Sequence, residues 1–562
     1  MKKKLIIFFL FLFFPLFAFS AQVGDRVNFY VDSNYDLYQR EKISATLKFI
    51  SQKAYFFVDD DWWEFLSENE RKEAEKTLSN LGKEFDSKIY PTLTSNFGLE
   101  WKPGIDNDER ITVLFHKMKK EAGGYFNSGD EYLKVQNPKS NVREMVYLNS
   151  ENILSPLIKS LLAHEFIHLI TFNQKEKIFG VEEEVWLNEM RAEYAPTLLG
   201  YDNEKENNLQ RRINQFLKKP TDSIVEWQGA SEDYGVLNLF GQYLVERMGK
   251  EILIDSLKRK ETGIASINQT LKEYGMKENF AQLFEDWTIT VIINDCNFSD
   301  KYCYKSSNLR SLRILPEIIF LPLSGETDFS QQRKTQNWAG NWIRFIGGSE
   351  DLKIKFDGQR NFFRVPYITQ DREGNFKVNY ISLDQNQKGE VLIKNFRKDI
   401  VSFTFIPIAQ VKNSDFNNNF YDFSYQVLIV KHQEENPQEI QKLLNQIEEL
   451  KKQIAFYQEK INQILNQKQN ISCQKIESDL FFGMTNNSQV RCLQEFLKIK
   501  EPELYPQGLV TGNFFNLTLQ AVIRFQEKYA SEILAPSGLQ KGTGFVGPAT
   551  RQKLNQLLSN PL

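Results

Sequence analysis

The chain has 562 residues, more than one hydrophobic core usually serves, so about two to four domains are expected. Its net charge of -3 and its lack of a basic cluster argue against a nucleic-acid-binding protein. Hydrophobic residues at 41% and charged residues at 25% are ordinary for a soluble globular chain.

Residues 1–21 have the features of a signal peptide. Three lysines precede an apolar run that ends at Phe17, and the small residues that follow place cleavage near Ser20 or Ala21. An uncleaved membrane anchor is the alternative, although the run is short for a bilayer span. No second apolar stretch is long enough to cross a bilayer. We therefore expect a secreted or cell-envelope-associated protein with no stable membrane span after cleavage.

Residues 22–305 predict an α+β domain. Short runs with strand character precede and follow a charged helix, which Ser67 and Glu70 begin with a capping box and Pro91 is expected to end. The second half is helical, with apolar residues at intervals of three and four. The predicted strands cover residues 26–31, 43–50, 54–58, 110–116 and 145–148, and the later helices cover 153–172, 181–199, 237–248 and 280–291.

Residues 306–432 predict a β-sandwich. Short strand-like runs recur at regular spacing, with turn residues such as Gly347 and Gly348 between them. These runs cover residues 318–323, 342–345, 352–356, 363–367, 376–381, 391–393, 401–406 and 425–430. No cluster of catalytic residues is recognisable in this stretch.

Residues 433–470 predict a coiled-coil helix, since apolar residues alternate at spacings of three and four. They are Ile440, Leu443, Ile447, Leu450, Ile454, Tyr457, Ile461 and Ile464. The pattern suits an oligomerising helix, a possible homo-oligomer contact, and equally a stiff spacer or a helix that docks on a neighbouring domain.

The four cysteines form two local pairs, and we expect the disulfides Cys296–Cys303 and Cys473–Cys492, as suits an exported chain. Free buried thiols, or one zinc site made by all four, are the alternatives. Neither pair has the CxxC spacing of a structural zinc site.

His164, Glu165 and His168 form an HExxH motif inside an apolar helical pattern. Residues i and i+4 of a helix share a face, so both imidazoles can bind one metal ion. Glu165 can then face the water on that metal. The alternative, two histidines packed into a core, would leave Glu165 beside an apolar face without a partner.

A catalytic zinc ion needs three protein ligands and one open position for water. Because only His116 and His432 remain as histidines, the third ligand is expected to be a carboxylate, and Glu189 on the following helix can supply it. Glu193 lies one helical turn further on, where it can hydrogen-bond a ligand imidazole. The alternative is a solvated acidic helix face, which we favour for residues 182–184.

These two motifs resemble those of the gluzincin peptidases, typified by thermolysin, and within them the hyicolysin-like peptidases. The residues that carry the resemblance are His164, Glu165, His168, Asn188, Glu189, Ala192 and Glu193. The resemblance covers roughly residues 24–295 and is loose outside the motifs. It implies a zincin-like catalytic domain, with Glu189 as the third zinc ligand and Glu193 orienting a zinc-binding histidine.

The ligand set implies a mechanism. Zinc lowers the pKa of its bound water towards about 7, and Glu165 is expected to take the proton and deliver it to the leaving amine. Thermolysin-like enzymes stabilise the oxyanion with a histidine and a tyrosine, but no histidine follows the motif within the helical region. We favour Tyr234 for this role, with Tyr194 and Tyr243 as alternatives and a core tyrosine as the remaining interpretation.

Peptidases of this architecture commonly hold their substrate as an added strand along a sheet edge. Residues 110–116 and 123–126 are the candidates for that edge, although the glycine pair in the second could equally form a plain turn.

Residues 471–562 resemble the peptidoglycan-binding domain, a small helical fold of cell-wall enzymes. The matching segments, in order, are residues 480–483, 490–494, 510–512, 518–526 and 544–551. The resemblance implies peptidoglycan as a partner, and a folded spacer is the alternative.

Three functions are therefore open. The first is a secreted zinc-dependent endopeptidase that hydrolyses peptide bonds in proteins and is tethered to the cell wall. The second is a hydrolase of peptidoglycan cross-links, which the C-terminal domain favours. The third is a non-catalytic wall-binding or adhesion protein, against which the intact motif argues.

Overall fold

A computed structural model describes residues 21–325, 327–411, 419–431, 437–467 and 473–559. The chain divides into two compact units, Met1–His432 and Gln433–Leu562. The described residues contain both helices and several sheets, which confirms the prediction of a multidomain chain with mixed α and β content. The predicted signal peptide lies almost wholly outside the described residues. Among the described helices, none is long and apolar enough to cross a membrane.

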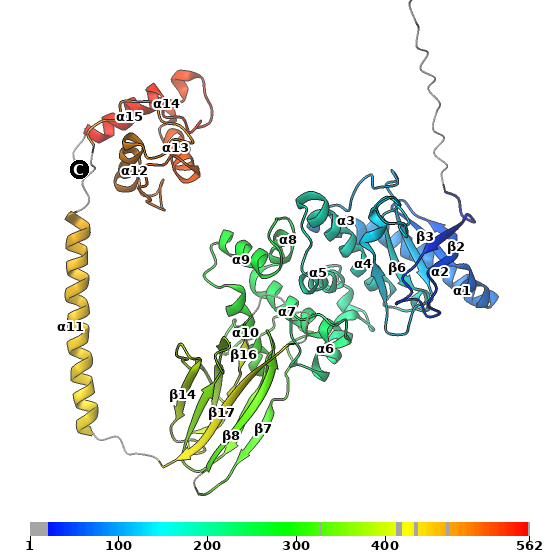
Figure 1. Cartoon of the computed structure of the whole chain (residues 1–562), viewed down its shortest axis with the longest axis horizontal. Helices are drawn as coiled ribbons and strands as arrows, with labels where there is room; N and C mark the ends of the chain where they lie inside the picture. The colour runs from blue at the N-terminus through cyan, green and yellow to red at the C-terminus, as the bar shows by residue number, and fades with distance from the viewer. Residues whose placement is uncertain (1–20, 326, 412–418, 432–436, 468–472, 560–562) are drawn as a thin grey trace, which may run out of the picture. The chain divides into compact units, whose positions relative to one another are not determined.

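The first unit begins with a six-stranded sheet in the order β1-β2-β3-β4-β6-β5 (Figure 1). Its strands are β1 (Arg26–Tyr30), β2 (Lys42–Ile50), β3 (Ala54–Asp59), β4 (Ile111–His116), β5 (Gly124–Phe126) and β6 (Met145–Asn149). β3, β4 and β6 run parallel, whereas β1, β2 and β5 pair antiparallel with their neighbours. β3, β4 and β6 are fully buried, as their continuous apolar runs require.

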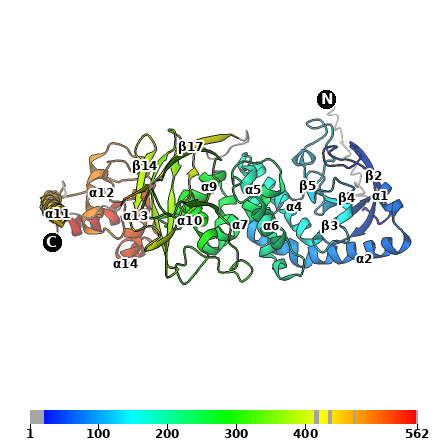
Figure 2. The ribbon, with the colours of Figure 1, turned by 90° about the horizontal axis from the view of Figure 1, so that it is seen from below.

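The helices of the first half begin with α1 (Asp60–Phe65) and α2 (Glu68–Glu84), and α2 lies beside β2 and β3 (Figure 2). The predicted capping box of Ser67 and Glu70 is present. The expected stop at Pro91 is wrong: the chain continues through the π-helical turn η1 (Phe85–Ile89) into α3 (Tyr90–Phe97). Pro91 lies in the first turn of α3, where its missing N–H costs no hydrogen bond.

A layer of helices follows the sheet. It comprises α4 (Ile158–Phe172), η4 (Asn173–Lys177), α5 (Val185–Leu198), η5 (Tyr201–Asn203), α6 (Asn208–Lys218), α7 (Ser231–Met248), α8 (Glu251–Leu257), α9 (Gly263–Glu273) and α10 (Phe280–Ile293), with short 3-10 turns η2 (Ser128–Glu131) and η3 (Ser150–Asn152) before it. α4 packs on β5 and β6 with one face and on α5 with another. One apolar core joins the sheet and these helices.

The strands after α10 form a four-stranded, a five-stranded and a short two-stranded sheet. The two larger sheets are mostly antiparallel and share an apolar core, as the sandwich prediction requires. Rings from the two sheets touch, for example Phe405 and Tyr425 with centroids 5.1 Å apart. The strands are β7 (Glu317–Leu321), β8 (Thr327–Gln336), β9 (Ile343–Gly347), β10 (Asp351–Asp357), β11 (Phe363–Arg364), β12 (Pro366–Asp371), β13 (Phe376–Tyr380), β14 (Lys388–Ile393), β15 (Ile400–Phe405), β16 (Ile408–Ala409) and β17 (Phe420–Val430).

The sandwich is not separated from the helical layer. The Trp342 indole N–H donates to the Thr288 carbonyl at 2.8 Å, and Trp338 and Trp342 belong to the same apolar core as α7 and α10. The described residues before residue 432 therefore form one compact unit. The boundary near residue 305 stays a prediction.

The second unit contains a long helix and a small helical domain. α11 (Pro437–Gln467) matches the predicted helix, and the apolar side chains of Ile447, Leu450, Ile454 and Tyr457 are exposed on it. The small domain packs α12 (Ser488–Lys500), α13 (Asn516–Lys528), α14 (Ala530–Ile533), η6 (Ala535–Ser537) and α15 (Pro548–Ser559) around its own core. Whether α11 self-associates stays a prediction.

Both predicted disulfides are confirmed. Cys296 pairs with Cys303 after α10, and Cys473 pairs with Cys492 of α12. Each closes a short loop within one unit, as the local spacing of the cysteines indicates.

Candidate metal centre

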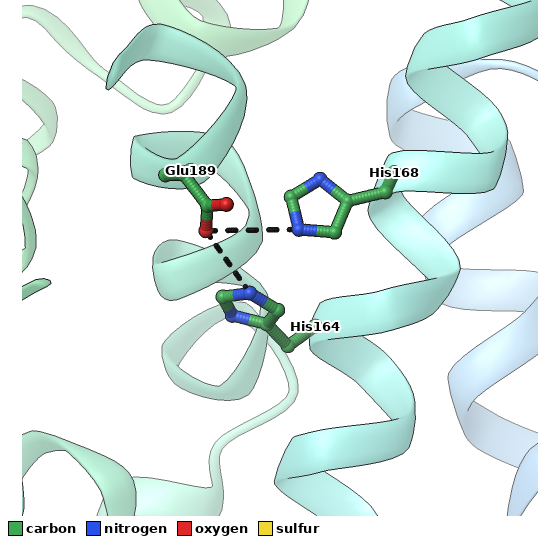
Figure 3. Close-up of side chains that lie close together, drawn as sticks. All are labelled: His164, His168 and Glu189. Carbon is green, nitrogen blue, oxygen red and sulfur yellow. Dashed lines mark ion pairs between the residues drawn. The ribbon is translucent and has the colours of Figure 1, made fainter. Parts of the chain in front are cut away.

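The helix α4 presents the HExxH residues on one side, and all three are buried. The helix is apolar on nearly every face because it lies between β5, β6, α3 and α5. His164 and His168, one turn apart, point the same way towards α5, as Figure 3 shows. The two rings lie 4.9 Å apart between centroids.

α5 brings Glu189 to the two histidines (Figure 3). Glu189 Oε2 lies 3.2 Å from His164 Nε2 and 3.6 Å from His168 Nε2. One ligand atom from each of the three side chains lies within 4.8 Å of the others. Two imidazole nitrogens and one carboxylate oxygen are donors that zinc takes in catalytic sites. The residues therefore fit a zinc ion.

Glu193, one turn after Glu189, faces the other side of the His164 ring, with its Oε1 3.2 Å from Nδ1. The Arg212 guanidinium of α6 donates to both Glu193 oxygens, and the Asn208 amide donates to Oε2 at 2.8 Å. Although burial opposes ionisation, Arg212 and His164 hold the pKa of Glu193 well below its ordinary value. A charged carboxylate at this position fixes the His164 ring with Nε2 directed at Glu189.

The buried site shifts the pKa of the HExxH residues. Burial raises the pKa of Glu165 to about 8, and the nearby charge of Glu189 adds to this effect. Burial disfavours the His164 cation, but the carboxylates of Glu189 and Glu193 outweigh it and raise the His164 pKa to about 10. Burial lowers the pKa of His168. The site thus concentrates negative charge around the two imidazoles, as suits a bound cation.

The three side chains open into a cavity of about 160 Å³. Its walls come from the β1–β2 loop and from β5, α4, α5 and α7. The lining residues are Tyr35, Gly124, Tyr125, Phe126, His164, Glu165, His168, Asn188, Glu189 and Tyr234. A larger cavity of about 440 Å³ lies on β10, β14 and β17 of the sandwich, but within the described residues no metal-binding cluster lines it.

Tyr234 is the tyrosine that the structure brings to this cavity among the three considered. The Tyr234 ring centroid lies 6.2 Å from that of His164. The Arg212 guanidinium lies over the Tyr234 ring, 4.4 Å from its centroid. Tyr194 and Tyr243 do not line the cavity, and the Tyr243 hydroxyl donates to the Lys301 carbonyl at 2.9 Å.

The sheet order corrects one of the two candidates for a substrate-binding edge. β4 lies between β3 and β6, so residues 110–116 cannot form an edge. β5 lies at one edge of the sheet, and its Gly124 contacts Glu165 so closely that an added Cβ would lie 2.7 Å from Oε1. His116 does not line the cavity, and its Nδ1 pairs with buried Asp36 at 3.2 Å.

Sequence reasoning missed three residues of the site: Tyr35, Asn188 as a lining residue, and Arg212. For Arg212 a signal existed, because Leu209, Ile213 and Phe216 have helical spacing after the N-cap residue Asn207. That pattern predicts α6 but not the partner of its arginine.

No family model matches the chain. Among solved structures, the pre-peptidase C-terminal domain of a Bacillus anthracis collagenase is 10% identical with a TM-score of 0.14, over 20% of this chain and 96% of that chain. CorA, a surface-associated copper-binding protein of Methylomicrobium album BG8, is 8% identical with a TM-score of 0.14. That match covers 20% of this chain and 98% of the CorA chain. TM-scores this low assign no fold.

The neutral metalloprotease ShpI of Staphylococcus hyicus is 27% identical to the chain over 278 residues. The match covers 43% of this chain and 58% of ShpI, so the chain spans less than two thirds of that relative. The chain is therefore similar to a metalloprotease over less than half of its own length.

Proposed function

We propose that the protein is a secreted zinc-dependent endopeptidase that hydrolyses peptide bonds in proteins. The observation that carries the proposal is the convergence of His164, His168 and Glu189 beside Glu165 in one cavity. Two imidazoles, a third carboxylate ligand and a free carboxylate next to them are the groups that metal-assisted peptide hydrolysis needs. The likeness to ShpI supports the same reaction class.

His164, His168 and Glu189 would hold the zinc ion. When bound, zinc would polarise the substrate carbonyl and make a water molecule more acidic. Glu165 takes the proton of the attacking water on a carboxylate oxygen and returns it to the nitrogen of the leaving amine.

Tyr234 is the proposed hydrogen-bond donor to the oxyanion. Burial raises the pKa of its hydroxyl above the ordinary value, so the group stays protonated and can donate. Arg212 contacts both the Tyr234 ring and Glu193, and so couples the position of this tyrosine to that of His164. A preorganised donor of this kind stabilises the charge that develops during attack.

The edge strand β5 is the proposed binding strand for the substrate. It borders the cavity and has β6 on one side only, so its outer edge can pair with an extended peptide. This placement would direct a peptide bond past Glu165, which touches Gly124.

We further propose that the small domain within residues 471–562 tethers the enzyme to peptidoglycan, with α11 as a spacer or oligomerising helix. The domain's resemblance to peptidoglycan-binding modules supports this proposal and also favours the second candidate function, hydrolysis of wall cross-links. A chain ending at residue 432, compared with the full chain in a sedimentation assay with purified sacculi, tests the tether.

Casein and purified sacculi, each incubated with and without a chelator, separate the candidate functions. Casein cleavage that the chelator abolishes and zinc restores supports the endopeptidase. Release of wall peptides supports the cross-link hydrolase. No product from either substrate would leave the non-catalytic binding protein as the remaining function.

A further inference from the structure

The loop between β1 and β2 extends to the cavity from the edge of the sheet that lies opposite β5. β1 and β2 lie at the opposite edge from β5, yet Tyr35 in their connecting loop lines the cavity with Gly124 and Tyr125. The loop crosses the end of β4, where the Lys119 N–H donates to the Tyr35 carbonyl at 2.9 Å. It therefore delivers one aromatic side chain to the candidate centre.

Buried charges fix this loop. Asp36, next to Tyr35, is fully buried and pairs with His116 at 3.2 Å and with Arg40 at 2.9 Å. Arg40 also pairs with Asp59 of β3 at 2.6 Å. These ion pairs and hydrogen bonds connect the backbone beside Tyr35 to β3 and β4 in the middle of the sheet.

The Tyr35 ring ends a stack of three tyrosines. Its centroid lies 4.6 Å from that of Tyr125, and Tyr125 lies 4.2 Å from Tyr147 of β6, with nearly parallel planes in both pairs. Tyr125 and Tyr147 are buried, whereas Tyr35 is 39% exposed at the cavity end. The stack holds the Tyr35 ring in one orientation while leaving one face of it open.

The Tyr35 hydroxyl is available as a donor. Within the described part of the chain, no hydrogen bond occupies it. Burial, together with the charges of Glu165 and Glu189, raises its pKa, so it stays protonated around neutral pH. The charges of Glu189 and Glu165 also raise the pKa of Tyr234. Tyr35 and Tyr234 both line the cavity that holds these carboxylates.

We propose that Tyr35 is a substrate-contacting residue whose hydroxyl donates a hydrogen bond to the peptide backbone beside the bond that is cleaved. This inference rests on the proposed peptidase function. The rigid loop and the ring stack make the donor preorganised, and such a donor acts mainly on the transition state. Tyr35 and Tyr234 would then be two phenol donors in one cavity, supplied by different parts of the chain.

The test compares Tyr35→Phe with Tyr38→Phe in the full chain loaded with zinc. Tyr38 belongs to the same loop, is 56% exposed and does not line the cavity. Tyr35→Phe keeps the ring stack and removes only the hydroxyl. We expect kcat on a fluorogenic peptide to fall on the order of tenfold or more, with KM and zinc content close to the unmodified protein. Tyr38→Phe should match the unmodified protein.

A Tyr35→Phe protein with kcat within twofold of the unmodified protein would overturn the proposal. A rise in KM alone would also overturn it, because it would make Tyr35 a wall of the cavity and not a transition-state donor. Glu165→Gln, run in parallel, separates this failure from that of the proposed function. If Glu165→Gln also cleaves the peptide at the normal rate, the assignment of catalysis to this cavity fails. If the unmodified protein cleaves nothing, the proposed peptidase function is what fails.

Discussion

Arg212 of α6 binds both carboxylate oxygens of Glu193, and the same carboxylate meets His164 Nδ1 at 3.2 Å. The chain thus fixes one proposed zinc ligand through a buried arginine that lies outside both motif helices. The arrangement holds His164 in the tautomer that leaves Nε2 for the metal, since Nδ1 donates to Glu193.

Glu193→Gln should weaken zinc binding by about 10- to 100-fold, because a neutral amide supports the His164 ring less well than a carboxylate. Competition with a zinc-sensitive chelating dye measures the affinity. Glu182→Gln is the matched control, since Glu182 is exposed in the same acidic stretch. Equal affinities for the two variants, in protein that circular dichroism shows to be folded, would contradict the role of Glu193.

Glu165→Gln should retain zinc and lose peptide hydrolysis by about 10²- to 10⁴-fold, because the amide cannot accept the proton of the attacking water. Zinc content by atomic emission and the rate on casein measure the two effects separately. A zinc-loaded variant that cleaves casein at the normal rate would exclude Glu165 as the base.

Tyr234→Phe should lower kcat by about 10²- to 10³-fold with little change in KM, since it removes a donor that acts in the transition state. Tyr194→Phe is the control, because Tyr194 lies outside the cavity. Steady-state kinetics on a fluorogenic peptide give both constants. If both variants keep full kcat, the oxyanion is stabilised by other groups.

Glu131 and Glu144 give the fold a pH dependence. Both are buried, and burial together with the Glu144 carboxylate raises the pKa of Glu131 well above its ordinary value. The folded state therefore holds a proton that the unfolded state releases above about pH 4.5. The stabilisation from this proton is complete below that pH and is lost as pH rises.

Glu131→Gln keeps the shape and cannot ionise, so its stability relative to the parent should increase between pH 6 and pH 9, by roughly 1 to 3 kcal/mol. Urea unfolding at the two pH values, in a Glu165→Gln background that prevents self-cleavage, measures the change. Glu73→Gln, at an exposed position of α2, is the control. A constant difference at both pH values would contradict the raised pKa.

The sequence predicts the helices of the centre well because their determinants are local. α4 and α5 carry apolar residues at helical spacing and the polar motif residues at fixed offsets, so His164, His168 and Glu189 can be placed before any tertiary contact is known. The paired strands of the sandwich are predicted for the same reason, from alternating or continuous apolar runs.

The remainder depends on contacts between distant segments. β8 escapes prediction because only Phe329 among its ten residues is apolar, and the strand forms by pairing with β17. That β5 and not β4 forms the edge follows from the strand order, which local patterns do not specify. Tyr35 reaches the cavity only because its loop crosses the sheet.

Zinc-edge anomalous scattering from crystals of the full chain tests the central claim most directly. The account predicts one strong peak within bonding distance of His164 Nε2, His168 Nε2 and a Glu189 oxygen, and its loss in Glu189→Ala crystals. No peak at this position, or a peak that persists unchanged without the Glu189 carboxylate, would contradict the account.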